Sequence, residues 1–315
     1  MYDANAPGRD AAVARGRLWR SVRYHGELEV KAMREVVLMA SMAAAGLLLL
    51  SAGCTAKSTK RVTGSTTHKT RPWVPGDSVV IDSINGGIEV NRGSDDSVVA
   101  DFTPFVLIGY DATDEEEKEE LEKLKPTLEV LADEDPPVIL AKTVRQGQVL
   151  SSLGADIDVR LPAEFDGRLE IRQNNGPLEV NSVAQASDLV VESDNGSCEV
   201  HAGGARMIDV FCDSGGLTGS IGEIPEDFVS ASLRTGRGNI QLDFPSGRFV
   251  VQAYSRSGGM VDVGNAADAG CSVDAASDSS KTITCGDANA EDPLYVVTSD
   301  DDEGAQLTHD IELSF

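Results

Sequence analysis

The residues whose chemistry depends most on spacing are the five cysteines of this 315-residue chain. Four of them form two groups with equal separation, Cys198 with Cys212 and Cys271 with Cys285. Thiolates can bind zinc, but the sequence has no C-x-x-C motif and no histidine at ligand spacing. We therefore expect disulfides formed in an oxidising compartment. Four cysteines allow three connectivities, and the equal spacing favours the two local pairs.

Residues that could carry out catalysis are sparse. The chain has four histidines, among them His68, His201 and His309, and no serine lies in a G-x-S-x-G motif. Carboxylates and a basic residue, such as Asp209, Asp213 and Arg234, are what glycoside hydrolysis requires. Every predicted strand ends in a charged residue, however, so these three resemble an ordinary solvated face. We expect no catalytic residue, no cofactor and no metal site, with a carbohydrate-active enzyme as the alternative.

One acidic run could attract calcium. The stretch "SDDDEG", Ser299–Gly304, offers several carboxylate oxygens, which are the ligands that calcium prefers. It lacks the spaced ligands of known calcium loops. We interpret it as a charged loop before a last strand.

A repeat positions these residues. The stretch "SDNGSCEV", Ser193 to Val200, nearly copies "QNNGPLEV", Gln173 to Val180, twenty positions earlier. In each copy apolar residues alternate with polar ones on both sides of a glycine. That alternation predicts two short strands that meet at a corner, each with one buried face. Copies centre on Gly86, Gly176, Gly196, Gly215 and Gly238, with a looser copy at Gly258 and Gly259.

The period of about 20 residues favours a β-solenoid, in which each unit buries its apolar face against its neighbours. An antiparallel β-sandwich is the alternative; it explains the alternation but not the recurrent corner. Cys198 takes the place that Leu178 has in the previous copy, and Cys212 is also on the inward set. A bridge between them would tie neighbouring units together.

One segment departs from the strand pattern. Residues 111–125 are dense in Glu and Lys and are followed by Pro126. We expect a short exposed helix here, capped by Asp114, with acidic residues in its first turns where the helix dipole favours them. This insertion is either a solvated decoration or a partner-binding element of an envelope-stress sensor.

The N-terminal region has the pattern of an export signal peptide. Residues 33–53 run from a basic start through an apolar stretch to small residues, which is the order of a secretory signal peptide. The ending "LLSAGC" resembles the lipobox of bacterial lipoproteins, which implies lipidation of Cys54. We expect residues 1–32 to be an extension upstream of the true start, 54–75 to be a flexible Ser/Thr/Lys-rich tether, and 76–315 to be the folded domain.

The repeats "INGGIEV", "NNGPLEV" and "DNGSCEV", with "VRLPAEF" before them, resemble the putative adhesin domain family of bacterial envelope proteins. The resemblance implies a non-catalytic β-solenoid at the cell envelope that binds an envelope protein or a polysaccharide, here as an outer-membrane lipoprotein held in the membrane by its lipid anchor. It implies no catalytic residue. The net charge of −25 argues against nucleic acid as a partner.

Overall fold

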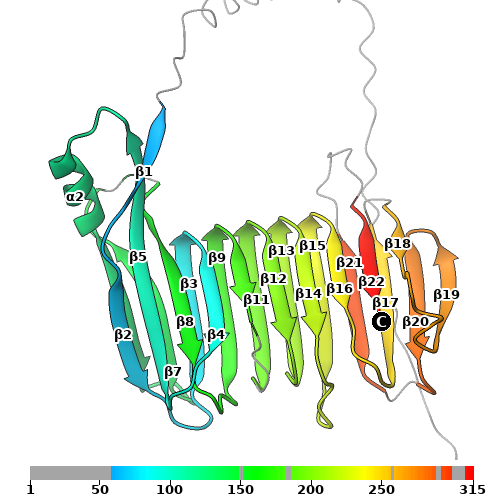
Figure 1. Ribbon diagram of the computed structural model, residues 1–315. Helices are drawn as coiled ribbons and strands as arrows, with labels where there is room; N and C mark the ends of the chain where they lie inside the picture. Colours follow the sequence, from blue (N-terminus) through cyan, green and yellow to red (C-terminus); the bar gives the residue numbers. More distant parts are fainter. Residues whose placement is uncertain are drawn as a thin grey trace, which may run out of the picture. The chain divides into compact units, whose positions relative to one another are not determined.

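The computed structural model describes residues 58–148, 150, 152–181, 186–256, 259–288, 292–299 and 309–315. In this part of the chain the strands form two sheets of eleven strands each, with both parallel and antiparallel neighbours. The apolar faces of the two sheets pack against each other around one main core (Figure 1). The expected all-β fold is confirmed, and the described strands form no closed barrel. No helix among the described residues is long and apolar enough to cross a membrane.

The glycine-centred copies form five strand pairs. The first strand of each pair lies in one sheet, called sheet B, and the second lies in the other, called sheet A. Neighbouring pairs are joined by parallel ladders in both sheets. The pairs are β3 (Ser78–Asn85) and β4 (Ile88–Arg92), β9 (Arg168–Asn175) and β10 (Leu178–Val180), β11 (Asp188–Asn195) and β12 (Cys198–Ala202), β13 (Met207–Ser214) and β14 (Leu217–Ile221), and β15 (Ser230–Arg237) and β16 (Ile240–Asp243).

Equivalent residues of successive copies lie side by side in the core. Leu169 pairs with Leu189, and Leu189 pairs with Ile208. These side chains are almost completely buried, and their neighbours along each strand point outward. The alternation in the sequence therefore sets which face of each sheet is apolar, and burial of that face supplies most of the stabilisation.

The corner glycine is required because the corners stack closely. A Cβ atom on Gly196 would lie 1.9 Å from the carbonyl oxygen of Gly176, and one on Gly215 would lie 2.0 Å from that of Gly196. A positive φ, which favours glycine, occurs at Gly196 but not at Gly215. Close approach of the neighbouring backbone is the reason that the two positions share.

Two further strand pairs are out of sequence order. The pair β7 (Val138–Arg145) and β8 (Gly154–Leu161) lies beside β3 and β4. The pair β21 (Leu294–Ser299) and β22 (Ile311–Ser314) lies between β15/β16 and the pair β17 (Phe249–Ser255) and β18 (Val261–Asp262) (Figure 1). The looser copy at Gly258 and Gly259 therefore follows the Gly238 copy in the sequence but does not lie directly beside it.

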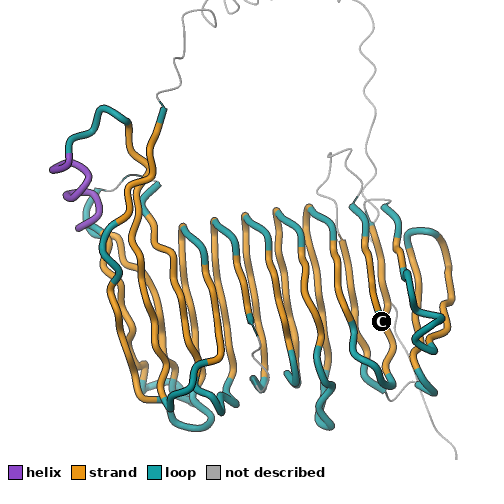
Figure 2. The backbone as a smooth tube through the Cα atoms, in the orientation of Figure 1, coloured by secondary structure: helices purple, strands orange, loops and turns teal. Residues whose placement is uncertain are grey.

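Antiparallel strands cover both ends of the stack (Figure 2). At one end β5 (Ser97–Gly109) pairs with β8 and also with β1 (Thr59–Thr63) and β2 (Thr67–Pro72), while β6 (Leu124–Leu131) pairs with β7. At the other end β20 (Ser280–Cys285) pairs with β17 and with the edge strand β19 (Cys271–Ser277). These strands separate the repeated pairs from solvent at either end.

The expected flexible tether over 54–75 is wrong for residues 59–72, which form β1 and β2. Both strands make antiparallel ladders to β5, and Val62 packs against a small cluster that contains Val106 and Leu124. The segment has few apolar residues because it lies at the edge of sheet A, where most side chains remain exposed. The sequence pattern of a polar edge strand resembles that of a linker.

The helix α2 (Asp114–Glu122) forms within the segment predicted to be helical, but Thr113 and not Asp114 caps it. The Thr113 hydroxyl accepts from the Glu116 amide at 3.3 Å, and Glu116 accepts from the Thr113 amide at 2.8 Å. This reciprocal pair is a capping box. The helix ends at Glu122, three residues before the predicted end, because β6 begins at Leu124.

Both local cysteine pairs form disulfides, as the spacing predicted. Cys198 of β12 and Cys212 of β13 are fully buried, and their bond joins two neighbouring strand pairs across the core. Cys271 and Cys285 lie directly opposite each other on β19 and β20. The residues between them form a hairpin, and Ile283 of β20 is buried in the core.

Candidate functional site

An open groove of about 1060 Å³ lies on the outer face of sheet A. Side chains of β1, β5, β8, β4 and β10 line it, together with the corners that precede β4 and β10. Its floor consists of outward-facing residues that alternate with the buried residues of the same strands. The backbone pairing of sheet A therefore holds these side chains in fixed positions, as a binding site requires.

A continuous row of five carboxylates crosses this face, one from each of five neighbouring strands. Asp101 pairs with Asp158, Asp158 with Glu89, Glu89 with Glu179, and Glu179 with Glu199. We call these five residues the carboxylate row. Neighbouring strands lie about 4.8 Å apart, and like charges directly opposite each other are unfavourable. The row therefore concentrates negative potential along the groove and beyond it.

One end of the row is neutralised by basic residues of the same domain. An Arg160 nitrogen lies 2.7 Å from Asp101 and another lies 3.8 Å from Asp158. The ring of His68, on β2, lies 2.7 Å from Asp101. Beside the row, Arg61 of β1 forms an ion pair with Asp156 and stacks 3.8 Å above the ring of Phe105.

At the other end of the row, Glu89 and Glu179 have uncharged amide partners, and Glu199 has a histidine partner. Glu89 accepts a hydrogen bond from Asn91 at 2.8 Å, and Glu179 accepts one from Asn181 at 2.7 Å. Glu199 lies 3.1 Å from the His201 ring, whose other nitrogen contacts Ser220. Among the described residues, neither Glu89 nor Glu179 has a Lys, Arg or His nitrogen within 4.0 Å.

The environments of the first two members of the row shift their pKa values in opposite directions. Burial raises the pKa of Asp158, and the charges of Glu89 and Asp101 add to the increase against the opposing charge of Arg160. Burial also acts to raise the pKa of Asp101, but hydrogen bonds from His68 and Arg160 outweigh it, so this pKa is lowered. Adjacent carboxyl groups with divergent pKa values occur in acid–base pairs and in structural ion-pair networks.

The candidate glycosidase residues chosen from the sequence lie elsewhere. Arg234 forms an ion pair with Asp209 at 3.1 Å and lies 5.3 Å from the Phe211 ring, while Asp213 is 4.0 Å from Arg237. All are on strands of sheet B, whereas the groove is on sheet A. They form surface ion pairs, as the solvated-face interpretation predicted.

The three histidines of the described residues do not converge. His68 contacts the carboxylate row at Asp101, His201 contacts it at Glu199, and the buried His309 precedes β22. The described residues contain no group of three or more His, Cys, Asp or Glu side chains placed to hold a metal ion. Cys54 and most of the acidic run at Ser299–Gly304 lie outside the described residues; Ser299 itself is buried at the end of β21.

Sequence reasoning missed the groove, although part of its pattern was visible. The three copies "IEVN", "LEVN" and "CEVH" place a glutamate two residues before an amide or imidazole, and these partners are the ones that the structure shows. The wall formed by β1 and β5 could not be predicted, because it depends on pairing between segments that are more than 40 residues apart.

Comparisons with known proteins give a limited result. No family model matches the chain, and no curated protein matches it. Among solved structures, a putative cell adhesion protein from Clostridium sporogenes has a TM-score of 0.40 and 9% identity over 79% of this chain and 99% of that chain. A putative adhesin from Bacteroides fragilis has a TM-score of 0.36 and 8% identity over 82% and 98%. Similarities of this size transfer neither a ligand nor an activity to this chain.

Proposed function

We propose that this chain is a lipid-anchored, non-catalytic binding module of the bacterial cell envelope, which binds its ligand in the groove on sheet A. The groove is the observation that carries this proposal. It is large enough for several residues of a linear ligand, and paired strands hold its lining rigidly. The described residues show no metal cluster, and the ion pairs of Asp209 and Asp213 leave those carboxylates already engaged.

We further propose that the repeated part is a β-solenoid. Its support is the parallel pairing of equivalent residues in successive copies, such as Leu178 with Cys198 and Ile88 with Leu178. In an antiparallel sandwich, neighbouring strands of a sheet would run in opposite directions. The recurrent corner glycine then follows from the stacking of one turn on the next.

The anchor would hold the domain close to the membrane. The first strand begins at Thr59, only five residues after Cys54. Five residues span at most about 18 Å when fully extended. We therefore place the domain at the membrane surface of the envelope, with outer-membrane attachment as the specific form of the proposal.

The anchor is tested by intact-mass analysis of the membrane fraction, with Cys54→Ser as the control. We expect the mass of residues 54–315 plus three acyl chains, and a soluble, unlipidated control. Binding is tested separately by cosedimentation of the soluble Cys54→Ser protein with purified envelopes. An unlipidated protein would overturn the anchor, and the absence of saturable cosedimentation would overturn the binding module.

A second candidate, a carbohydrate-active enzyme, is favoured by one observation. Asp158 and Asp101 lie side by side in the groove with pKa values shifted apart, as the acid and the base of a glycosidase require. The test is release of reducing ends from a panel of envelope and plant polysaccharides. Turnover that disappears in Asp158→Asn would establish the enzyme, and no turnover on any substrate would support the binding module.

A further inference from the structure

The carboxylate row is covered by cations over only part of its length. Its first part is paired with Arg160 and His68, and the adjoining Asp156 is paired with Arg61. Its second part consists of Glu89, Glu179 and Glu199, which lie on adjacent strands without an arginine or lysine partner among the described residues. The same outer face is therefore neutralised at one end and open at the other.

The chain itself shows what kind of group covers the first part. Arg61 and His68 come from β1 and β2, an extended segment with the sequence "TKRVTGSTTHKTRP" that is rich in basic residues. This segment runs along β5, at the edge of sheet A, and places Arg61 beside Asp156 of β8 and His68 beside Asp101 of β5. Basic side chains of an extended segment therefore already pair with carboxylates of this face within the structure.

The second part of the carboxylate row has the geometry to pair with further basic side chains in the same way. Its three carboxylates lie about one strand spacing apart, so a ligand that crosses the strands meets one after another. Asn91, Asn181 and His201 fix their orientation, which lowers the entropy lost on binding. The mutual repulsion of adjacent glutamates is relieved when a cation lies between them.

Other ligand classes fit this surface less well. The described residues hold no metal cluster here, because the glutamates are spread along the sheet and do not converge. A neutral polysaccharide usually stacks on exposed aromatic rings. The only ring lining the groove is Phe105, which is 7% exposed beneath Arg61.

We infer that Glu89, Glu179 and Glu199 bind the lysine or arginine side chains of an extended cationic polypeptide, which crosses the strands of sheet A beyond the carboxylates already paired with Arg61, Arg160 and His68. This inference rests on the proposed function and names the ligand class of the same groove. Binding of this kind depends on charge, so it weakens as ionic strength rises.

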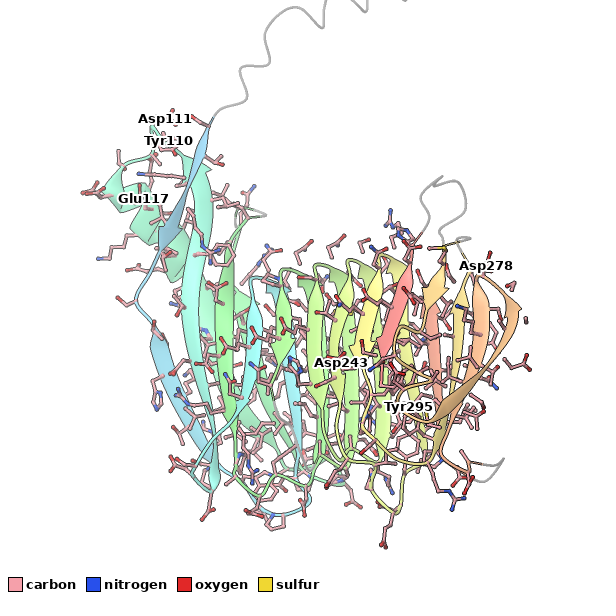
Figure 3. All side chains as sticks on the ribbon, turned by 45° about the vertical axis from the view of Figure 1, so that its right-hand side comes forward. Tyr110, Asp111, Glu117, Asp243, Asp278 and Tyr295 are labelled. Atoms are coloured by element: carbon pink, nitrogen blue, oxygen red, sulfur yellow. A yellow bond between two sulfur atoms is a disulfide. The ribbon has the colours of Figure 1, made fainter. Side chains whose placement is uncertain are left out.

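The test measures binding of fluorescein-labelled octalysine to the full chain carrying Cys54→Ser, by fluorescence anisotropy at low and at physiological ionic strength. The groove variant is Glu89→Gln with Glu179→Gln and Glu199→Gln. The matched control is Asp268→Asn with Asp274→Asn and Asp278→Asn, three exposed residues in and near the terminal hairpin, of which Asp278 is labelled in Figure 3. Both variants remove three negative charges, so non-specific attraction by net charge falls equally in both.

Each exposed charge pair contributes roughly twofold to fivefold in affinity, so we expect the groove variant to bind octalysine about tenfold or more weakly than the unsubstituted groove. We expect the affinity of the control variant to change by less than about twofold. Equal weakening in both variants would overturn the inference. It would also be overturned if calcium or chitohexaose bound the groove and octalysine did not.

A second variant keeps the inference testable if the groove variant fails to fold. Arg61→Gln frees Asp156 next to the row, and we expect it to bind octalysine about twofold more tightly. If the groove variant fails to fold, the absence of this gain would overturn the inference. Lipidation and envelope cosedimentation are measured independently, so a failure of octalysine binding leaves the proposed function standing with another ligand.

Discussion

Among single side chains, Tyr295 combines complete burial with a hydroxyl that lacks a hydrogen-bond partner among the described residues. It lies on β21 among the rings of Phe228, Phe244 and Phe249 (Figure 3). A buried hydroxyl without a partner costs about 1–3 kcal/mol. We predict that Tyr295→Phe raises the free energy of unfolding in urea by about 1 kcal/mol.

Tyr254→Phe is the matched control, because the Tyr254 hydroxyl is partly exposed and lies 3.4 Å from Gln252. We expect this control to change the free energy of unfolding by less than about 0.5 kcal/mol. A loss of stability in Tyr295→Phe would show that the hydroxyl has a partner, such as a buried water molecule.

The same residue makes stability depend on alkaline pH. Burial raises the pKa of Tyr295 above the ordinary value of 10.0, so the folded protein keeps a proton that the unfolded chain releases. Ionisation of this residue leaves the free energy of unfolding unchanged below pH 10 and lowers it progressively as the pH rises above that value. We predict that wild type loses up to about 1.4 kcal/mol per pH unit relative to Tyr295→Phe in this range. Parallel pH profiles of the two proteins in urea unfolding would contradict this.

At the level of strands and corners, the stacked glycines are the most constrained feature. Gly196 has a φ of 143°, and a Cβ there would lie 1.9 Å from the backbone oxygen of Gly176. We predict that Gly196→Ala lowers the free energy of unfolding by about 3 kcal/mol or more, because two backbone segments must separate. Gly264→Ala is the control, since nothing lies within 4 Å of a Cβ at that position. Equal unfolding midpoints for the two variants would contradict the stacking argument.

The two disulfides should differ in what they stabilise. Each joins cysteines 14 positions apart. In the chain-entropy model, a disulfide that closes a loop of this length stabilises the folded state by about 3 kcal/mol. We predict that replacing Cys198 and Cys212 by Ala lowers the global free energy of unfolding by about that amount. Replacing Cys271 and Cys285 should instead speed hydrogen exchange in β19 and β20 alone. Faster exchange throughout the domain in the second variant would show that the hairpin is coupled to the whole stack.

For the whole domain, the inserted pair β21/β22 connects the repeated strands to the hairpin end. Tyr295, Val297, Ile311 and Leu313 are all fully buried between β15/β16 and β17/β18. We predict that deletion of residues 292–315 removes hydrogen-exchange protection from residues 249–285 and leaves residues 168–221 protected, because stacked units contact only their neighbours. Addition of a peptide of residues 292–315 should restore the protection. Loss of protection everywhere would show a single cooperative unit.

The sequence predicted the parts of this fold that depend on local pattern. Alternation identified the strands, spaced glycines identified the corners, and equal spacing identified the cysteine pairs. The position of β21/β22 could not be predicted, because alternating residues such as Tyr295 and Val297 fit beside any neighbouring strand. The polar strand Thr67–Pro72 was missed for the opposite reason, since its pairing with β5 and not its apolar content makes it a strand. The carboxylate row became apparent only when Asp101 and Asp158 were brought beside the glutamates of the repeat.

The insertion of β21/β22 has a consequence for the timing of biosynthesis. A chain that emerges from the ribosome or an export channel from its N-terminal side can add β9 to β16 to the growing stack as each strand pair appears. The strands β17 to β20 emerge next, but their place in the stack is not available until residues 294–314 have followed. Residues 249–285 must therefore wait, unpaired with the stack, for the segment that separates them from it. A chain cut short in this interval exposes apolar strand edges, which makes it a ready substrate for chaperones and proteases.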